Sequence, residues 1–159
     1  DGGASSTGAA TGAERHWRAL ESLYRSAPVN NTFRSTLTIP EGGRSSIRFT
    51  VDRSTFHAAG AAHGTIYFKM LDDAAFYAAN SLVSDRFLLT TAFNLNLTAP
   101  IHEGELEAQG QWISGKRRVF IAESRLINAD GEEVARGTGT FMRSRIDLSS
   151  LDGYRVDTR

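Results

Sequence analysis

A chain of 159 residues is long enough for one domain with a proper hydrophobic core and too short for two comfortable ones. Its 18 basic and 18 acidic side chains cancel, which argues against the basic face that nucleic acid requires, and the absence of cysteine excludes disulfides and thiolate sites. No apolar run approaches membrane-spanning length, so we expect a cytoplasmic protein without nucleic-acid or membrane partners.

The N-terminal stretch divides into a tail and a helix. Residues 1–13 (DGGASSTGAATGA) carry too little apolar surface to fold, so we expect a flexible tail. In residues 14–28, large apolar side chains recur at helical spacing until Pro28 ends the pattern. This spacing predicts a short amphipathic helix docked on the domain, with a substrate lid as the less favoured role.

Residues 29–147 read as a single α+β domain, followed by a C-terminal tail at 148–159. Residues 45–52 (SSIRFTVD) alternate between polar and apolar as a strand does. Longer strands are predicted at 87–99, 104–114, 117–128 and 133–145. The turns SGKR and NADGEE join the last three of these. The second half is therefore predicted to be an antiparallel meander whose long strands curl.

One helix lies among these strands, from Gly64 to about Val83, and it is apolar around most of its circumference. Such a helix is buried on nearly all sides. The economical architecture is a single long antiparallel sheet wrapped around one central helix.

Two adjacent aspartates, Asp72 and Asp73, lie in the middle of this apolar helix. A carboxylate among apolar side chains costs free energy unless something pairs with it. Lys69 precedes Asp73 by four residues, so an i,i+4 ion pair explains Asp73. No second basic side chain one turn away neutralises Asp72. It either faces solvent or stands at the mouth of an apolar pocket, where desolvation tunes it as a base or nucleophile.

A loop enters this helix through His63, Gly64 and Thr65. The first turn of a helix offers unpaired N–H groups and the positive end of its dipole, and a glycine allows another molecule to approach closely. This combination suits a carbonyl oxygen that acquires negative charge, as in an oxyanion hole. Many glycines merely begin helices, so the pattern indicates a site only together with other features.

In combination, these features resemble the hotdog-fold acyl-CoA thioesterases of the PaaI-like branch (4-hydroxybenzoyl-CoA thioesterase superfamily). The resemblance rests on the His-Gly pair at 63–64, on Asp72 nine residues after the histidine, and on the strand FNLNLTAP. The closing stretch GELEAQGQWISGKRRVFIAESRLINADGEEVARGTGTF resembles the last strands of that family. The similarity covers residues 46–145 and implies the same curled sheet around a helix.

The resemblance implies a role for each residue of the site. Gly64 would donate its N–H to the thioester oxygen, and Asp72 would act as the nucleophile or as the base that activates water. Thr90 falls where a hydroxyl helps to hold that water. His57 stands where many relatives carry an asparagine that orients the carbonyl or the water, and His63 is the histidine of the motif.

The resemblance also implies partners. The carboxylate and the oxyanion donor typically come from opposite subunits, so the active unit would be a homodimer or a dimer of dimers. No metal and no separate cofactor are implied, because coenzyme A is part of the substrate. Its phosphates need basic side chains, and the candidates are Lys116, Arg117 and Arg118 at a hairpin turn with Arg143 and Arg145 on the last strand.

Two features bear on the acyl group. Thr65 replaces the second glycine that is usual in the family, which narrows the pocket without removing the Gly64 donor. Several aromatic side chains are candidates for lining the acyl pocket, although aromatic residues of this kind are more often part of a core. They are Phe68, Phe76, Tyr77, Phe87 and Phe93.

Two other functions remain open. Asp52 and His57 are five residues apart, as in the hotdog enoyl-CoA hydratases and dehydratases, but the Asn-Pro pair found there is missing from this sequence. The second alternative is a non-catalytic acyl-CoA-binding hotdog protein. The presence of both Gly64 and Asp72 argues against it.

Overall fold

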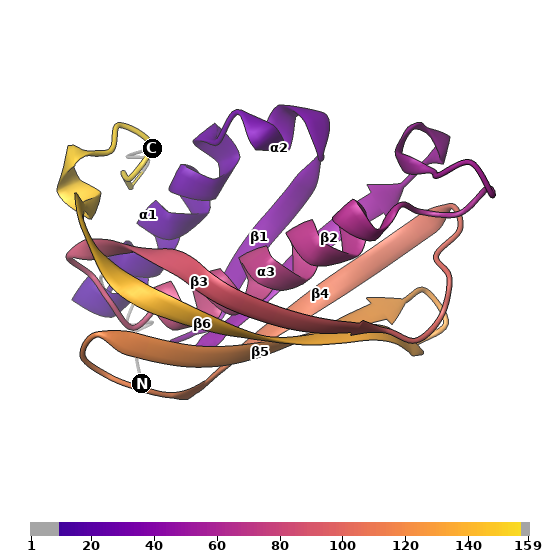
Figure 1. Ribbon diagram of the computed structural model, residues 1–159. Coiled ribbons are helices and arrows are strands. Elements are labelled where there is room, and N and C mark those ends of the chain that lie inside the picture. The colour runs from indigo at the N-terminus through magenta and orange to yellow at the C-terminus, as the bar shows by residue number, and fades with distance from the viewer. Residues whose placement is uncertain (1–9, 157–159) are drawn as a thin grey trace, which may run out of the picture.

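The computed structural model describes residues 10–156, and Figure 1 shows their arrangement. The helices are α1 Gly12–Ser26, α2 Val29–Thr32 and α3 Gly64–Asn80, with short 3-10 helices at Arg53–Thr55 and Leu148–Ser150. The strands are β1 Ser35–Glu41, β2 Arg44–Val51, β3 Arg86–Leu97, β4 Gly104–Ser114, β5 Val119–Asn128 and β6 Glu133–Asp147. They form one antiparallel sheet in the order β1-β2-β4-β5-β6-β3.

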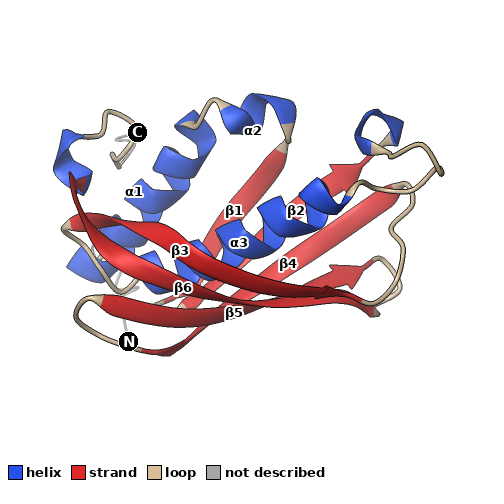
Figure 2. Cartoon of the chain, viewed as in Figure 1, coloured by secondary structure: helices blue, strands red, loops and turns tan. Residues whose placement is uncertain are grey.

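The predicted α+β hotdog architecture is confirmed, because this sheet curls around the central helix α3 (Figure 2). Each predicted strand is present within two residues of its expected bounds, and β1 is a further strand that the sequence analysis did not identify. The helix expected to reach Val83 ends at Asn80, whose side chain turns back to the following loop. Of the expected tails, residues 1–9 and 157–159 lie outside the described residues.

The first helix is docked on the domain, at the end of α3 that carries Asn80. His16 is buried between the Tyr154 hydroxyl, 2.7 Å from its Nδ1, and the Asn80 carbonyl oxygen, 2.8 Å from its Nε2. Trp17 donates from its indole N–H to the Ser81 carbonyl at 3.1 Å. These contacts favour a structural helix over a substrate lid. No helix within residues 10–156 has the length and apolar character needed to cross a membrane.

The backbone of α3 lies directly on the sheet. Ser45 and Ser124 donate hydroxyl hydrogen bonds to the carbonyl oxygens of Ala74 and Leu71, at 2.5 and 2.7 Å. A Cβ added at Gly110 of β4 would lie 2.0 Å from the Ala74 oxygen. Only glycine permits this approach, so the turn of α3 that carries the two aspartates is fixed against the sheet.

Strand β3 forms an edge of the sheet and contains a bulge. Its register with β6 shifts between Thr90 and Ala92, which leaves Thr91 as an extra residue. Side chains alternate between the two faces of a strand. The extra residue therefore allows both Thr90 and Phe93 to point toward α3.

Two glycines of β6 make room for Phe93. A Cβ on Gly137 would lie 2.4 Å from the Phe93 ring, and one on Gly139 would lie 2.8 Å from it. The ring also packs edge to face against Phe68 of α3, with 5.5 Å between ring centroids. The Gly-Thr-Gly-Thr sequence of the last strand thus has a packing role beneath this aromatic pair.

Candidate active site

Asp72 projects from the middle of α3 toward β3. Its Oδ1 accepts a hydrogen bond from the Thr90 hydroxyl at 2.9 Å, and no ion pair joins it to another residue of the described chain. Burial raises the pKa of Asp72 to about 6; the negative charge of Asp73 adds to this rise, while the Thr90 hydrogen bond and Lys69 oppose it. The carboxylate is thus ionised at neutral pH and is a stronger base than an ordinary aspartate.

Asp73 differs from its neighbour in having a cationic partner. The Lys69 ammonium lies 2.5 Å from the Asp73 carboxylate, which confirms the predicted i,i+4 pair. The same ammonium donates to the side chains of Asn30 at 2.5 Å and Tyr24 at 3.3 Å. Asp73 therefore belongs to a polar cluster that joins α3 to the N-terminal helices. Of the two aspartates, only Asp72 is left without a cationic partner among the described residues, and it is the one that can act as a base.

Gly64 begins α3 with an unused N–H donor. The preceding residue, His63, caps the helix, because its ring Nδ1 accepts the Thr65 N–H at 3.1 Å. The Gly64 N–H has no acceptor among residues 10–156. A Cβ added at Gly64 would meet only a methyl group of Leu97, at 4.0 Å. The position is open, so a carbonyl oxygen has room to reach this donor.

A hollow of about 330 Å³ lies against Gly64. Its other lining residues are His57, Ala62, Tyr67, Leu97, Thr98, Ala99 and Pro100. The Nδ1 atom of His57 accepts the Ala59 N–H at 3.0 Å, so the neutral ring carries its proton on Nε2. Tyr67 donates its hydroxyl to the Ala99 carbonyl at 2.7 Å and so fixes the opposite wall. The hollow is therefore lined by Gly64 and His57, which are the two candidate N–H donors, and by several apolar side chains.

The two halves of the site lie apart within one chain. Gly64 and Asp72 are eight residues apart in the same helix, which separates them by about 12 Å along its axis. Figure 1 shows the loop that precedes α3 at one end of the molecule, whereas Asp72 lies in the middle of the helix. One copy of the chain does not place both groups on a single thioester.

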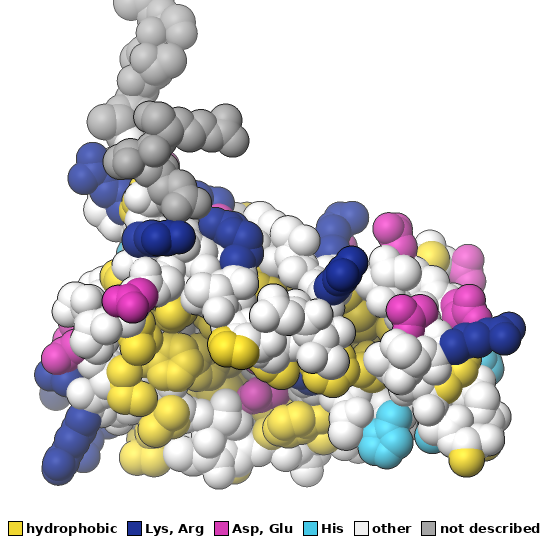
Figure 3. All heavy atoms as spheres, turned by 90° about the horizontal axis from the view of Figure 1, so that it is seen from above, with side chains coloured by type: hydrophobic (Ala, Val, Ile, Leu, Met, Phe, Trp, Pro, Cys, Tyr) yellow, Lys and Arg dark blue, Asp and Glu magenta, His cyan; other side chains and the backbone are white. Residues whose placement is uncertain are grey.

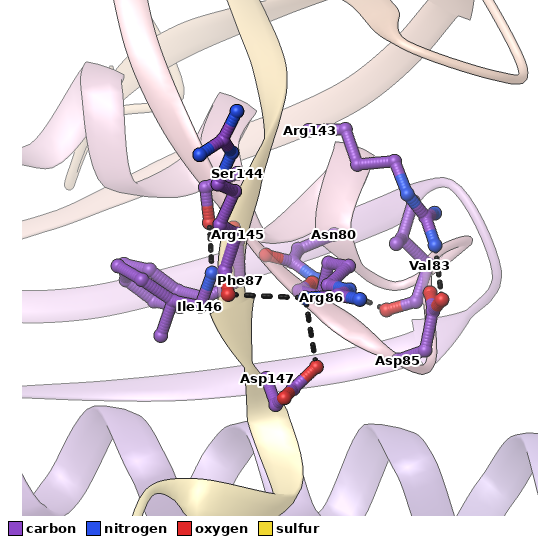
Figure 4. Close-up of polar contacts among 10 residues, drawn as sticks. All are labelled: Asn80, Val83, Asp85, Arg86, Phe87, Arg143, Ser144, Arg145, Ile146 and Asp147. Atoms are coloured by element: carbon purple, nitrogen blue, oxygen red, sulfur yellow. Dashed lines mark hydrogen bonds and ion pairs between the residues drawn. The ribbon is translucent and has the colours of Figure 1, made fainter.

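The predicted basic residues lie at the other end of the molecule. Arg143 is paired with Asp85 (Figure 4), and its strand partner in β3 is Leu88, whereas Leu97 beside the hollow is nine residues further along β3. Nine strand residues span about 30 Å. The β4–β5 turn, which carries the exposed side chains Lys116, Arg117 and Arg118, is close to Arg143, because the Arg143 N–H donates to the Arg118 carbonyl at 2.8 Å. In the same region Arg145 accepts, through its carbonyl, a hydrogen bond from Arg86.

The aromatic candidates for the acyl pocket fall into two groups. Phe76 and Tyr77 are buried in the core, and Phe87 packs on Phe76 with 5.0 Å between ring centroids. Phe68 and Phe93 instead form the edge-to-face pair between Gly64 and Asp72, and Phe68 is 43% exposed. Seen from above in Figure 3, hydrophobic side chains are exposed over the middle of the molecule, with an acidic side chain among them.

Asp52 and His57, the pair on which the hydratase alternative depends, are not joined by a hydrogen bond within the part of the chain that the structure describes. Asp52 caps a short 3-10 helix and accepts from the N–H and hydroxyl of Ser54, which lowers the pKa of Asp52. His57 is engaged by the Ala59 N–H instead. The geometry gives no support to an acid–base pair of these two residues.

One residue that the sequence analysis did not single out for function is Asn80, the last residue of α3. It is wholly buried, and its amide bonds to the loop that leads to β3 (Figure 4). The available signal was a lone amide at the end of the apolar run AAFYAAN, where a buried polar group requires partners.

Several of these features lie in a segment that is similar to known proteins. Residues 59–135 match the family model described as thioesterase superfamily, and this segment includes Gly64, Asp72 and Thr90. The structure is similar to that of the Escherichia coli PaaI protein from the phenylacetic acid degradation operon, with a TM-score of 0.78 and 18% identity, covering 85% of this chain and 97% of that one. A thioesterase family protein from Silicibacter pomeroyi is 26% identical, with a TM-score of 0.73 and coverage of 81% and 97%.

Proposed function

Because residues 59–135 match the thioesterase superfamily model and the chain has the hotdog fold, we propose that it hydrolyses acyl-CoA thioesters in the cytoplasm to a free acid and CoA. The observation that carries this proposal is Asp72. It is a partly buried carboxylate, hydrogen bonded to the Thr90 hydroxyl, with a pKa raised to about 6 by burial. A base of this kind suits the activation of water near neutral pH.

The chemistry follows from the groups present. Asp72 takes a proton from water while the water oxygen attacks the thioester carbon. The C–S bond then breaks, and the proton held by Asp72 passes to the leaving sulfur, which releases the thiol and the acid. Alternatively the carboxylate attacks directly, and water cleaves the resulting anhydride. In both routes the carbonyl oxygen becomes negative, and the N–H of Gly64 and the Nε2–H of His57 are the donors that stabilise it.

A second copy of the chain completes the site. The free edge of β3 exposes backbone groups that pair readily with another strand, and Leu89 and Leu97 on this strand are 47% and 49% exposed. Antiparallel pairing of two β3 edges about an axis through Asn94, with Thr91 left out of this ladder as it is against β6, places Thr90 of one copy opposite Leu97 of the other. Asp72, held by Thr90, then faces the hollow of the second copy.

The same pairing gives the basic turn a role. Since the two β3 strands run in opposite directions, the β4–β5 turn of one copy comes to the end of the dimer that carries the other copy's Gly64. Lys116, Arg117 and Arg118 are then our candidates for contacts with the CoA phosphates. Arg143, already paired with Asp85, completes this basic group.

The decisive experiment measures thiol release from a panel of short, medium, long and aromatic acyl-CoA thioesters. We expect Asp72→Asn to lower kcat by about 10²- to 10⁴-fold, because it removes the base or nucleophile. Asp73→Asn is the matched control: it makes the same change one residue along and leaves kcat within about tenfold, since Asp73 is engaged with Lys69.

Three outcomes would contradict the proposal. Full activity of Asp72→Asn would remove this carboxylate from the mechanism. Hydration of crotonyl-CoA without thiol release would identify a hydratase. Binding of acyl-CoA by calorimetry, with no thiol released from any member of the panel, would identify a binding protein.

A further inference from the structure

Asn80 joins the helix that carries Asp72 to the strand that carries Thr90. Its Oδ1 accepts the Leu88 N–H at 2.9 Å, and its Nδ2 donates to the carbonyls of Val83 at 3.0 Å and Arg86 at 3.1 Å. The side chain is wholly buried, and all of its hydrogen bonds go to backbone groups of the segment that follows α3. Figure 4 shows Asn80 beside Val83 and Arg86.

The strand segment that Asn80 holds is irregular on both sides. The register of β3 with β6 shifts between Arg86 and Leu88 and again between Thr90 and Ala92. Residues 88–90 therefore lie between two breaks in the ladder, on an edge strand whose other side pairs with no strand among the described residues. A segment of this kind is held less firmly by its ladder than a regular strand is.

Only two places provide side-chain hydrogen bonds between α3 and β3 within residues 10–156. One is Asn80, bonded to Leu88 and Arg86, and the other is the bond between Thr90 and Asp72. Leu88 is two residues from Thr90, and Asn80 is two helical turns from Asp72. The amide thus ties the end of α3 to the start of β3, close in sequence to the hydroxyl that bonds to the carboxylate.

We propose that Asn80 is a positioning residue, which acts on the reaction by setting the place of the Thr90 hydroxyl relative to the Asp72 carboxylate. This inference rests on the proposed thioesterase function. Asn80 itself touches neither substrate nor water, because it is enclosed between α1, α3 and the start of β3. Its effect on catalysis passes through Thr90.

A double-mutant cycle tests this coupling. Asn80→Ala is expected to lower kcat about tenfold with KM within about twofold, because lost hydrogen bonds misplace the hydroxyl. In a Thr90→Val background, where the hydroxyl is already absent, the same change is expected to lower kcat by less than about twofold. If the fold-changes in kcat of Asn80→Ala and Thr90→Val simply multiply in the double variant, the two residues act independently and the inference is overturned.

A neighbouring residue provides the matched control. Ser81 is also buried and hydrogen bonded, to the Gly43 N–H and the Ala78 carbonyl, but its side chain makes no bond to β3. We expect Ser81→Ala to reduce stability and to give the same fold-change in kcat with Thr90 or Val at position 90. Coupling of Ser81 as strong as that of Asn80 would mean a general effect of destabilisation.

A measurement independent of activity separates this inference from the proposed function. In Asn80→Ala, amide hydrogen exchange is expected to accelerate at residues 88–90 while β2 and β4 keep their protection. If Asn80→Ala does not fold, Asn80→Asp keeps the acceptor for the Leu88 N–H and takes its place in both experiments. Uniform acceleration across the sheet would overturn the positioning role. Absence of turnover by the unmodified protein would overturn the proposed function and leave the exchange result to decide the role of Asn80.

Discussion

Two faces of α3 have opposite characters. The closed face carries Lys69 and Asp73, which pair with each other, and Lys69 also donates to the side chains of Tyr24 and Asn30. The open face carries Phe68 and Asp72, and the free N–H of Gly64 lies at the start of the same helix. Its polar groups have few partners, and Phe68 remains 43% exposed.

This difference shows how two identical side chains acquire different roles one residue apart. Successive residues of a helix point in directions about 100° apart. Asp73 therefore points to the Lys69 ammonium, whereas Asp72 points to the Thr90 hydroxyl at the edge of the sheet. Burial raises the pKa of both carboxyls, but Lys69 donates a hydrogen bond to Asp73 alone. The closed face should therefore determine stability, and the open face activity.

After Asp72→Asn, the largest effect on kcat is expected from Gly64→Pro, also on the open face. Proline fits the first position of a helix, and the extended backbone of His63 suits a residue before proline, so the fold should persist. The substitution removes the N–H, and we expect kcat to fall by about 10²- to 10³-fold. Gly64→Ala keeps the N–H and should retain most activity; equal loss in both variants would argue for crowding rather than for a lost donor.

On the closed face, Lys69→Met should lower the free energy of unfolding and leave kcat nearly unchanged. The Lys69 and Asp73 side chains are only 13% and 23% exposed, so an unpaired Asp73 costs about 2–3 kcal/mol of unfolding free energy. Urea denaturation at pH 8 measures this loss. The double variant Lys69→Met with Asp73→Leu should recover most of the stability, and a large loss of kcat in Lys69→Met would break the division between the two faces.

The smallest expected effect is a gain in stability from Asp72→Asn. The folded-state pKa of Asp72 is raised from 3.8 to about 6, so between these values the folded chain binds more protons than the unfolded chain does. Stability therefore falls as the pH rises through this window and stays lower above it. Partial exposure reduces the effect, and we expect Asp72→Asn to be about 1–2 kcal/mol more stable at pH 8 and no more stable below pH 4. Urea denaturation at fixed protein concentration checks both values, and a loss of stability at pH 8 would contradict the pKa shift.

Much of the fold was predictable because local sequence patterns determine most of its strands and its central helix. Alternation and turn residues defined five strands, and the apolar run defined α3. Strand β1 was missed: its apolar pattern is short and Pro40 interrupts it, which an edge strand tolerates. The helix end was predicted three residues late, because Leu82 and Val83 continue the apolar pattern beyond the turn at Asn80.

The site was predictable only in part, since its parts depend on contacts far apart in the sequence. Spacing in one helix distinguished Asp73 from Asp72, because the partner Lys69 is local. The partner of Arg143 is Asp85, 58 residues away, and no local pattern indicates it. Whether Thr90 reaches Asp72 likewise depends on the direction its side chain takes within β3.

The bulge at Thr91 divides β3 into two phases. Before it, even-numbered side chains such as Leu88 and Thr90 face the helix; beyond it, odd-numbered ones such as Phe93 do so. Deletion of this one residue would shift the phase and turn either the hydroxyl or the aromatic ring to the outer surface. We therefore expect position 91 to tolerate many side chains but no change in chain length, so an alignment that gains or loses one residue there would mark a relative with a differently built site.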